Sequence, residues 1–176
     1  MESVAPQDII VIDEAGADLR MDSEYARAEG GKRATSARPF ARGNKFSIIG
    51  ALSVLGIIAV MYVEMSVNTD IFLAFITTML VPKLRRGMYV ILDNVGFHKS
   101  EEITRVIESV GARVVFLPPY SPDLSPIEKM WSKIKEILRK LKPRSKAEFH
   151  DSIGDALNSV EYSDCEEWFE CCGYNV

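Results

Sequence analysis

Two aspartates each follow a short run of apolar, β-branched residues. Asp13 comes after Ile9–Ile12, and Asp93 comes after Met88–Leu92. Side chains at the carboxyl ends of strands line the crevice at the edge of an α/β sheet. If the two strands are neighbours, both carboxylates face one spot and repel each other, so the pair needs a cation or a shared proton. Taken alone, each aspartate is explained as a turn former.

A third carboxylate, Glu128, falls on the first turn of a lysine-rich helix that we expect to begin at Pro126. Three oxygen donors surrounded by basic residues suit Mg²⁺, or Mn²⁺ as its substitute, acting on phosphate. Two such ions can activate an attacking oxygen and stabilise the leaving one. The structural alternative is a capping box formed by Ser125 and Glu128, with proline at the first helical position. On spacing alone, the capping box is the simpler interpretation.

Three residues close to these carboxylates have structural explanations as well. Asn94, directly after Asp93, is typical of an ordinary turn. His98 is one of only two histidines and, taken singly, is as well explained by a loop position as by an active one. Trp131 on the basic helix is interpreted as a core or interface residue rather than as a platform for base stacking. These residues become informative only together with the carboxylates.

The remaining pattern predicts an α/β fold with a mixed sheet, because short apolar runs alternate with segments of helical periodicity. Residues Ala17–Asn44 are polar and aperiodic, so we expect mostly loop there. Asn68, Thr69 or Asp70 can cap the first helix, and Ser145 with Glu148 can cap the last. The expected strands are Ile9–Ile12, Phe46–Leu55, Ile57–Val67, Met88–Leu92 and Arg113–Leu117, and the expected helices are Ile71–Leu80, Glu101–Val110, Pro126–Lys140 and Ser145–Val160.

The stretch Phe46–Val63 carries no charge and is long enough to be a membrane-span candidate. Serines and glycines interrupt it, and many of its residues favour β-structure. Two buried strands joined by a turn around Gly56 therefore explain it better. Continuous apolar strands are expected at the centre of a sheet that is covered on both faces. We therefore expect no membrane association.

The net charge of −4 conceals an uneven distribution of basic residues. Basic residues are concentrated in Arg27–Lys45 and in Lys129–Lys146, whereas none follows Lys146. Two basic stretches favour a surface that binds a polyanion, although such runs can also be solvated faces. The residues that we expect to contact DNA phosphates are Arg27, Lys32, Arg33, Arg42, Lys129, Lys133 and Lys140.

The last part of the chain, 161–176, is acidic and holds all three cysteines. We expect it to be a tail that faces away from the body formed by residues 1–160. An odd number of cysteines at one end is a poor disulfide framework, so a reducing cytoplasm is the expected location. No CxxC pair or histidine accompanies Cys165, Cys171 and Cys172, which argues against a metal site there.

Two long stretches resemble the second and third catalytic blocks of bacterial insertion-sequence transposases of the mariner superfamily. These are ILDNVGFHKS (Ile91–Ser100) and FLPPYSPDLSPIEKMWSKIK (Phe116–Lys135), and 34 residues separate Asp93 from Glu128, as is typical of that group. VIDEAG resembles the block of the first aspartate, and YARAEGGKR with FSIIGALS resembles the segment that follows it. The resemblance spans most of the chain, from about Ile9 to Ser159.

This resemblance implies an RNase H-like fold and a DDE metal triad at Asp13, Asp93 and Glu128. It implies two Mg²⁺ ions and cleavage of double-stranded DNA at element ends, followed by strand transfer into a TA-containing target by a homodimer on DNA. Asn94 and His98 match family positions that support the site.

Two departures from the family pattern matter. Ser125 stands where asparagine is usual. Only a dozen residues precede Asp13, which leaves no room for the helix-turn-helix region that reads element ends. A separate helix-turn-helix polypeptide is therefore an expected partner. The alternatives are an idle or regulatory DNA-binding relic of a transposase, or another RNase H-like nuclease, which the proline-rich block disfavours.

Overall fold

A computed structural model describes residues 4–22, 28–33, 35, 45–94, 96–119 and 121–176. The strands are β1 (Ile9–Asp18), β2 (Lys45–Ser53), β3 (Gly56–Val63), β4 (Tyr89–Leu92) and β5 (Arg113–Phe116). The α-helices are α1 (Thr69–Phe75), α2 (Glu101–Ser109), α3 (Pro126–Leu141), α4 (Lys146–Asn158) and α5 (Tyr162–Cys171). Short 3₁₀ or π turns are η1 (Pro6–Asp8), η2 (Ile76–Leu80), η3 (Val81–Lys83), η4 (Gly96–Lys99) and η5 (Pro122–Leu124).

The five strands form one mixed sheet in the order β3-β2-β1-β4-β5. β1, β2 and β3 pair antiparallel, whereas β1–β4 and β4–β5 pair parallel. The parallel pairing of β4 with β5 through α2 follows the sequence prediction. Because β1 and β4 are central neighbours, the two expected aspartate strands do lie side by side.

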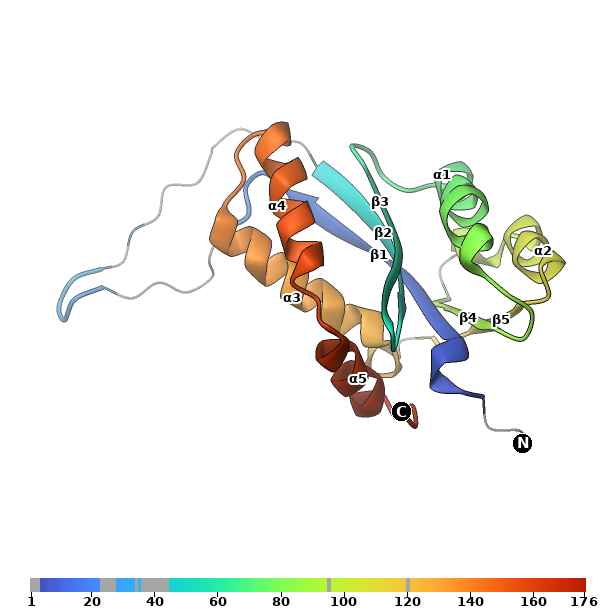
Figure 1. Ribbon diagram of the computed structural model, residues 1–176. Helices are drawn as coiled ribbons and strands as arrows, with labels where there is room; N and C mark the ends of the chain where they lie inside the picture. Colours follow the sequence, from blue (N-terminus) through green and yellow to red (C-terminus); the bar gives the residue numbers. More distant parts are fainter. Residues whose placement is uncertain (1–3, 23–27, 34, 36–44, 95, 120) are drawn as a thin grey trace.

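Helices cover both faces of the sheet, as predicted. α3, α4 and α5 lie on one side and α1 and α2 on the other (Figure 1). Strand alternation divides the core accordingly, because successive side chains point to opposite faces. Val11 of β1 packs in the cluster under α3 to α5, while Ile10 and Ile12 pack in the cluster under α1 and α2. The fold is a three-layer α/β/α arrangement.

β1 is longer than the sequence predicts, and this corrects the position of Asp13. Its pairing with β4 covers only Ile9–Ile12, but its pairing with β2 continues to Asp18. Asp13 therefore lies within β1, at the point where one neighbour strand ends and the other continues. The continuous apolar run ends at Ile12 because only alternate residues of the following half, Ala15 and Ala17, are buried in the core.

The apolar stretch is a hairpin of β2 and β3, with Gly56 at a φ of +129° at the turn. No helix in the described part of the chain is long and apolar enough to cross a membrane. The first helix begins two residues before the expected Ile71. Asn68 caps it by accepting a hydrogen bond from the Ile71 backbone N–H at 2.9 Å, and its last turns are the irregular η2 and η3.

The acidic C-terminal segment does not face away from the body. Its helix α5 packs on α3, and Cys165, Trp168 and Phe169 are buried in the same core cluster as the residues of α3. In the sequence, acidic residues separate these three apolar residues, and this obscures their helical spacing. All three cysteines are free thiols.

Candidate active site

The strand register brings Asp13 and Asp93 together. The last parallel pair between β1 and β4 joins Ile12 to Leu92, so each aspartate is the next residue along its chain. β1 continues past this point while β4 ends, which opens the edge of the sheet beside both carboxylates. The crevice expected at the end of a parallel strand is therefore present, although only one of the two strands stops there.

A cavity of about 520 Å³ adjoins this edge. The proline-rich segment between β5 and α3 forms one wall, and the two aspartates and the first turn of α3 form the others. All three predicted carboxylates line this cavity. The lining residues are Asp13, Asp93, Asn94, Leu117, Pro118, Pro119, Ser121, Pro122, Ser125 and Glu128.

The capping-box interpretation of Glu128 fails in the structure. The backbone N–H of Ser125, which the glutamate would have to bind, donates to the Pro122 carbonyl at 3.0 Å. The Ser125 side chain makes no capping hydrogen bond either. Glu128 is exposed, and its carboxylate has no hydrogen-bond or ion-pair partner among the described residues. The Glu128 side chain therefore lines the cavity without acting as a helix cap.

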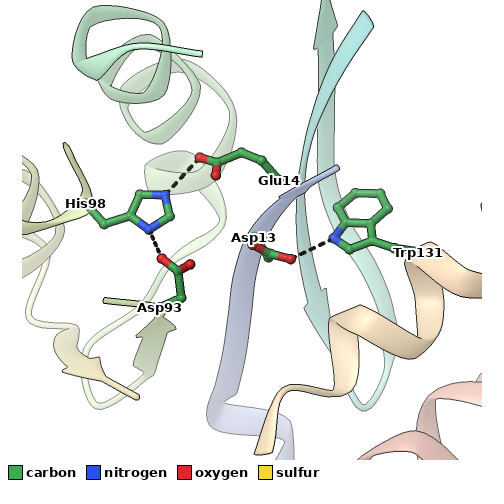
Figure 2. Close-up of polar contacts among 5 residues, drawn as sticks. All are labelled: Asp13, Glu14, Asp93, His98 and Trp131. Atoms are coloured by element: carbon green, nitrogen blue, oxygen red, sulfur yellow. Dashed lines mark hydrogen bonds and ion pairs between the residues drawn. The ribbon is translucent and has the colours of Figure 1, made fainter. Parts of the chain in front are cut away.

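Asp13 is held by an indole from α3. Trp131 Nε1 donates to Asp13 Oδ2 at 3.1 Å (Figure 2). Burial raises the pKa of Asp13 to about 7; a hydrogen bond from the Glu14 backbone opposes the rise, and the charges of Glu128, Glu14 and Asp93 add to it. Asp13 therefore ionises less readily than an ordinary aspartate, and a nearby positive charge would favour its ionised form.

Asp93 is held by a different buried ring. His98 is fully buried at 0% exposure, and its Nδ1 donates to Asp93 Oδ1 while its Nε2 donates to Glu14 Oε1 at 2.8 Å (Figure 2). Burial lowers the pKa of His98, but the hydrogen bonds and charges of the two carboxylates outweigh burial and raise that pKa to about 9. The ring is therefore a cation at neutral pH, and it lies against Phe72 with centroids 4.3 Å apart.

The donor set fits Mg²⁺ or Mn²⁺ in its chemistry, because three carboxylates line one cavity and hard cations prefer oxygen ligands. Among the described residues, no three His, Cys, Asp or Glu side chains stand close enough to form a ready ligand cluster. Like charges without a cation between them repel, so carboxylates of such a site are expected to stand apart. The three carboxylates would have to come closer together to hold an ion jointly.

The predicted DNA-contacting residues divide into three groups. Arg27 and Arg42 lie outside the described residues. Lys32, Lys133 and Lys140 form ion pairs with Glu29, Asp164 and Glu136, respectively. Arg33 and Lys129 are exposed and have no ion-pair partner in the described part of the chain. The positive charge of the basic helix is therefore partly neutralised within the protein, which the sequence did not reveal.

Two residues of the site escaped the sequence analysis. Glu14 was not expected to bind His98, and Trp131 was assigned to the core without its contact to Asp13. Strand alternation is the signal that could have found Glu14, because neighbours on one strand point to opposite faces. Trp131 follows Glu128 by three residues, so both lie on the same side of α3 and face the same strand.

Comparisons with known proteins identify the family and the fold. A family model described as DDE superfamily endonuclease matches residues 8–150. The fold is similar to that of the Mos1 transposase in its paired-end complex with the left transposon end, with a TM-score of 0.79 and 16% identity over 95% of this chain and 52% of that chain. The Mos1 strand transfer complex gives a TM-score of 0.76 with 18% identity over 95% and 52% of the two chains.

The Mos1 catalytic domain with Raltegravir and Mn gives a TM-score of 0.72 at 13% identity, over 94% of this chain and 78% of that chain. These likenesses establish the RNase H-like fold that the sequence predicts. The chain spans about half the length of the longer Mos1 chains that it matches. No curated protein sequence matches the chain.

Proposed function

Because this chain belongs to the DDE superfamily endonucleases, we propose that it is the catalytic domain of a DNA transposase, with Asp13, Asp93 and Glu128 as the metal-binding triad. The observation that carries the proposal is the convergence of these three carboxylates on one cavity, while Glu128 has no structural partner. The Mos1 complexes contain transposon ends, which supports double-stranded DNA as the substrate here too.

The three carboxylates would hold two Mg²⁺ or Mn²⁺ ions. Such ions, when bound, activate the attacking oxygen and stabilise the leaving oxygen of an in-line phosphoryl transfer. Asp13 supplies a carboxylate that has no cationic partner among the described residues, and Asp93 supplies one that His98 orients. Asn94 lines the same cavity and can contact the DNA backbone. Glu128 completes the set from α3, opposite the strand carboxylates.

We expect phosphate contacts mainly from basic side chains that have no carboxylate partner among the described residues. Lys129 follows Glu128 and is exposed, so it can neutralise a phosphate next to the cavity. Lys140 can also exchange its carboxylate partner for a phosphate, because an exposed ion pair contributes little stability. We propose that Asn94, Lys129 and the triad contact the same DNA strand.

Recognition of particular element ends belongs to a different module. The described residues include no helix-turn-helix unit, and phosphate contacts alone carry no sequence information. We propose that this module lies elsewhere in the enzyme or in a separate polypeptide, that the assembly acts as a homodimer on DNA with a TA target, and that the free cysteines reflect a reducing cytoplasm.

Metal-dependent nicking of supercoiled plasmid by the full chain tests this proposal. Glu128→Gln should reduce nicking by at least about 100-fold, since glutamine cannot supply negative charge to a metal. Its stability should change by less than about 0.5 kcal/mol, because no cap is lost. Glu136→Gln is the matched control: it removes an exposed carboxylate two turns further along the same helix, away from the cavity. Nicking that survives Glu128→Gln would show that Glu128 is not a metal ligand.

A further inference from the structure

Trp131 is the largest fully buried side chain of the protein among the described residues, with an exposure of 1%. Its position on α3 is one turn beyond Glu128, and α3 lies across β1 and β2. A buried indole N–H requires an acceptor. Here the acceptor is Asp13 Oδ2 at 3.1 Å, a carboxylate of the proposed triad that has no cationic partner among the described residues (Figure 2).

Gly50 makes room for this indole. It is the residue of β2 that pairs directly with Asp13, so the two point to the same face of the sheet. A Cβ at position 50 would stand 2.6 Å from Trp131 Cη2 and 2.9 Å from Cζ2. Both separations are shorter than carbon atoms tolerate, and φ at Gly50 is not positive, so space rather than backbone freedom requires glycine here.

We propose that Trp131, seated on Gly50, is a positioning residue that fixes the Asp13 carboxylate for metal binding and ties it to the helix that carries Glu128. This inference rests on the proposed metal-dependent function. Hydrogen bonds behind a metal ligand hold its orientation, and their loss typically weakens metal binding by about 10- to 100-fold. Asp13 on β1 and Glu128 on α3 then keep fixed positions relative to each other.

The hydrogen-bond donor to Asp13 is the uncharged indole N–H of Trp131, and its lack of charge matters for this role. A lysine or arginine in this place would neutralise Asp13 and compete with an incoming cation. The indole N–H orients one oxygen and leaves the negative charge in place. His98 does the opposite at Asp93, where a charged ring is the partner.

The alternative is that Trp131 only fills the core and donates to the nearest acceptor. A core role predicts that removing the indole lowers the free energy of unfolding and leaves the metal affinity of the folded protein unchanged. Trp168 of α5 is a matched control, because it is buried in the same cluster and makes no hydrogen bond to a carboxylate of the described residues. Both tryptophans can be replaced by phenylalanine.

Titration of Mn²⁺ into the full chain by calorimetry, with the thermal midpoint of each variant recorded without metal, tests the inference. Trp131→Phe should weaken Mn²⁺ binding at least about tenfold, and Trp168→Phe less than about twofold. Equal affinities in the two folded variants would overturn the inference and leave the proposed function standing. No Mn²⁺ binding by the wild-type chain would overturn both, because there would then be no ligand to position.

Gly50→Ala provides a second variant should Trp131→Phe fail to fold. The added methyl must displace the indole, so Mn²⁺ binding should weaken although Asp13 and Trp131 are both present. Where Trp131→Phe does fold, the two substitutions can also be combined. Phenylalanine lacks the two indole atoms that the methyl meets, so Gly50→Ala should have a much smaller effect in the Trp131→Phe background. Additive effects in this cycle would show that Gly50 does not act through Trp131, which contradicts the inference.

Discussion

Asp13 and Asp93 occupy adjacent positions in the strand register, but their negative charges are compensated differently. Asp13 receives a hydrogen bond from a neutral indole, and burial raises its pKa to about 7. Asp93 accepts from His98, a ring whose pKa of about 9 makes it a cation at neutral pH. Among the described residues, Asp93 therefore has a cationic partner and Asp13 has none. Two aspartates of the same register position can thus differ in electrostatics, because burial dominates at Asp13 and a cationic ring lies beside Asp93.

The largest effect that we expect concerns both aspartates alike. Asp13→Asn and Asp93→Asn should each reduce Mn²⁺-dependent plasmid nicking by at least about 10³-fold, or about 4 kcal/mol of transition-state stabilisation. Gel assays of the full chain measure this, with Asp155→Asn on α4 as a control carboxylate outside the cavity. If one aspartate variant kept wild-type nicking, that aspartate would not belong to the triad.

Removing the charged imidazole of His98 should abolish the charge compensation of Asp93. His98→Gln should lower the free energy of unfolding by about 2 kcal/mol near pH 6, less than for a fully buried pair because Asp93 is partly open to water. The folded pKa of His98 is raised above its ordinary 6.5, so this contribution is complete below pH 6.5 and is lost as the pH rises through about 9. Chemical denaturation from pH 6 to 9.5 measures the difference, and a difference that does not shrink with pH would contradict a charged His98.

A smaller effect should have opposite signs at the two aspartates. Without metal at pH 8, Asp13→Asn should raise the free energy of unfolding by about 1 kcal/mol, because solvent at this half-buried position screens much of the cost of the ionised carboxylate. The folded pKa of Asp13 is raised, so the gain should shrink as the pH falls through 7, where the wild-type carboxyl becomes protonated. Asp93→Asn should lower stability instead, since His98 loses a charged partner.

Metal-free denaturation curves of both variants at pH 8 and pH 5.5 sharpen this comparison. The same sign for the two substitutions at pH 8 would mean that the aspartates are electrostatically equivalent.

The smallest expected effect distinguishes free from neutralised lysines. Lys129→Ala should weaken non-specific DNA binding several-fold and reduce the salt slope by about 0.9, the value for one phosphate contact. Lys133→Ala should change DNA affinity less, because Asp164 already binds its ammonium. Fluorescence anisotropy with a labelled duplex at several salt concentrations measures both, and an equal loss for the two variants would show that the ion pair opens freely on DNA.

Local patterns in the sequence predict the elements well where apolar spacing is strong. α3 occupies Pro126–Leu141, close to the predicted span, because its apolar residues fall at three- and four-residue steps. α5 escaped prediction because only three buried residues stand among many acidic ones. The length of β1 escaped as well, since its second half pairs with β2 alone and buries only small alternate residues, Ala15 and Ala17.

The candidate site follows the same division between local and long-range information. Each triad residue carries a local signal, namely the end of an apolar run or the first turn of a helix. The contact between Trp131 and Asp13 joins residues 118 positions apart and depends on a glycine of a third element, so no local pattern contains it. Contacts of this kind follow from the strand register, which only the folded chain defines.

The central claim is that Asp13, Asp93 and Glu128 together hold the metal ions. Anomalous scattering from crystals of the full chain grown with Mn²⁺ tests it most directly, because the signal identifies the metal and its position. We expect an anomalous peak in the cavity between the two aspartates, with Glu128 rotated towards it, and the loss of that peak in Asp13→Asn crystals. A cavity without a peak at saturating Mn²⁺, or a peak that survives in Asp13→Asn at full height, would contradict the account.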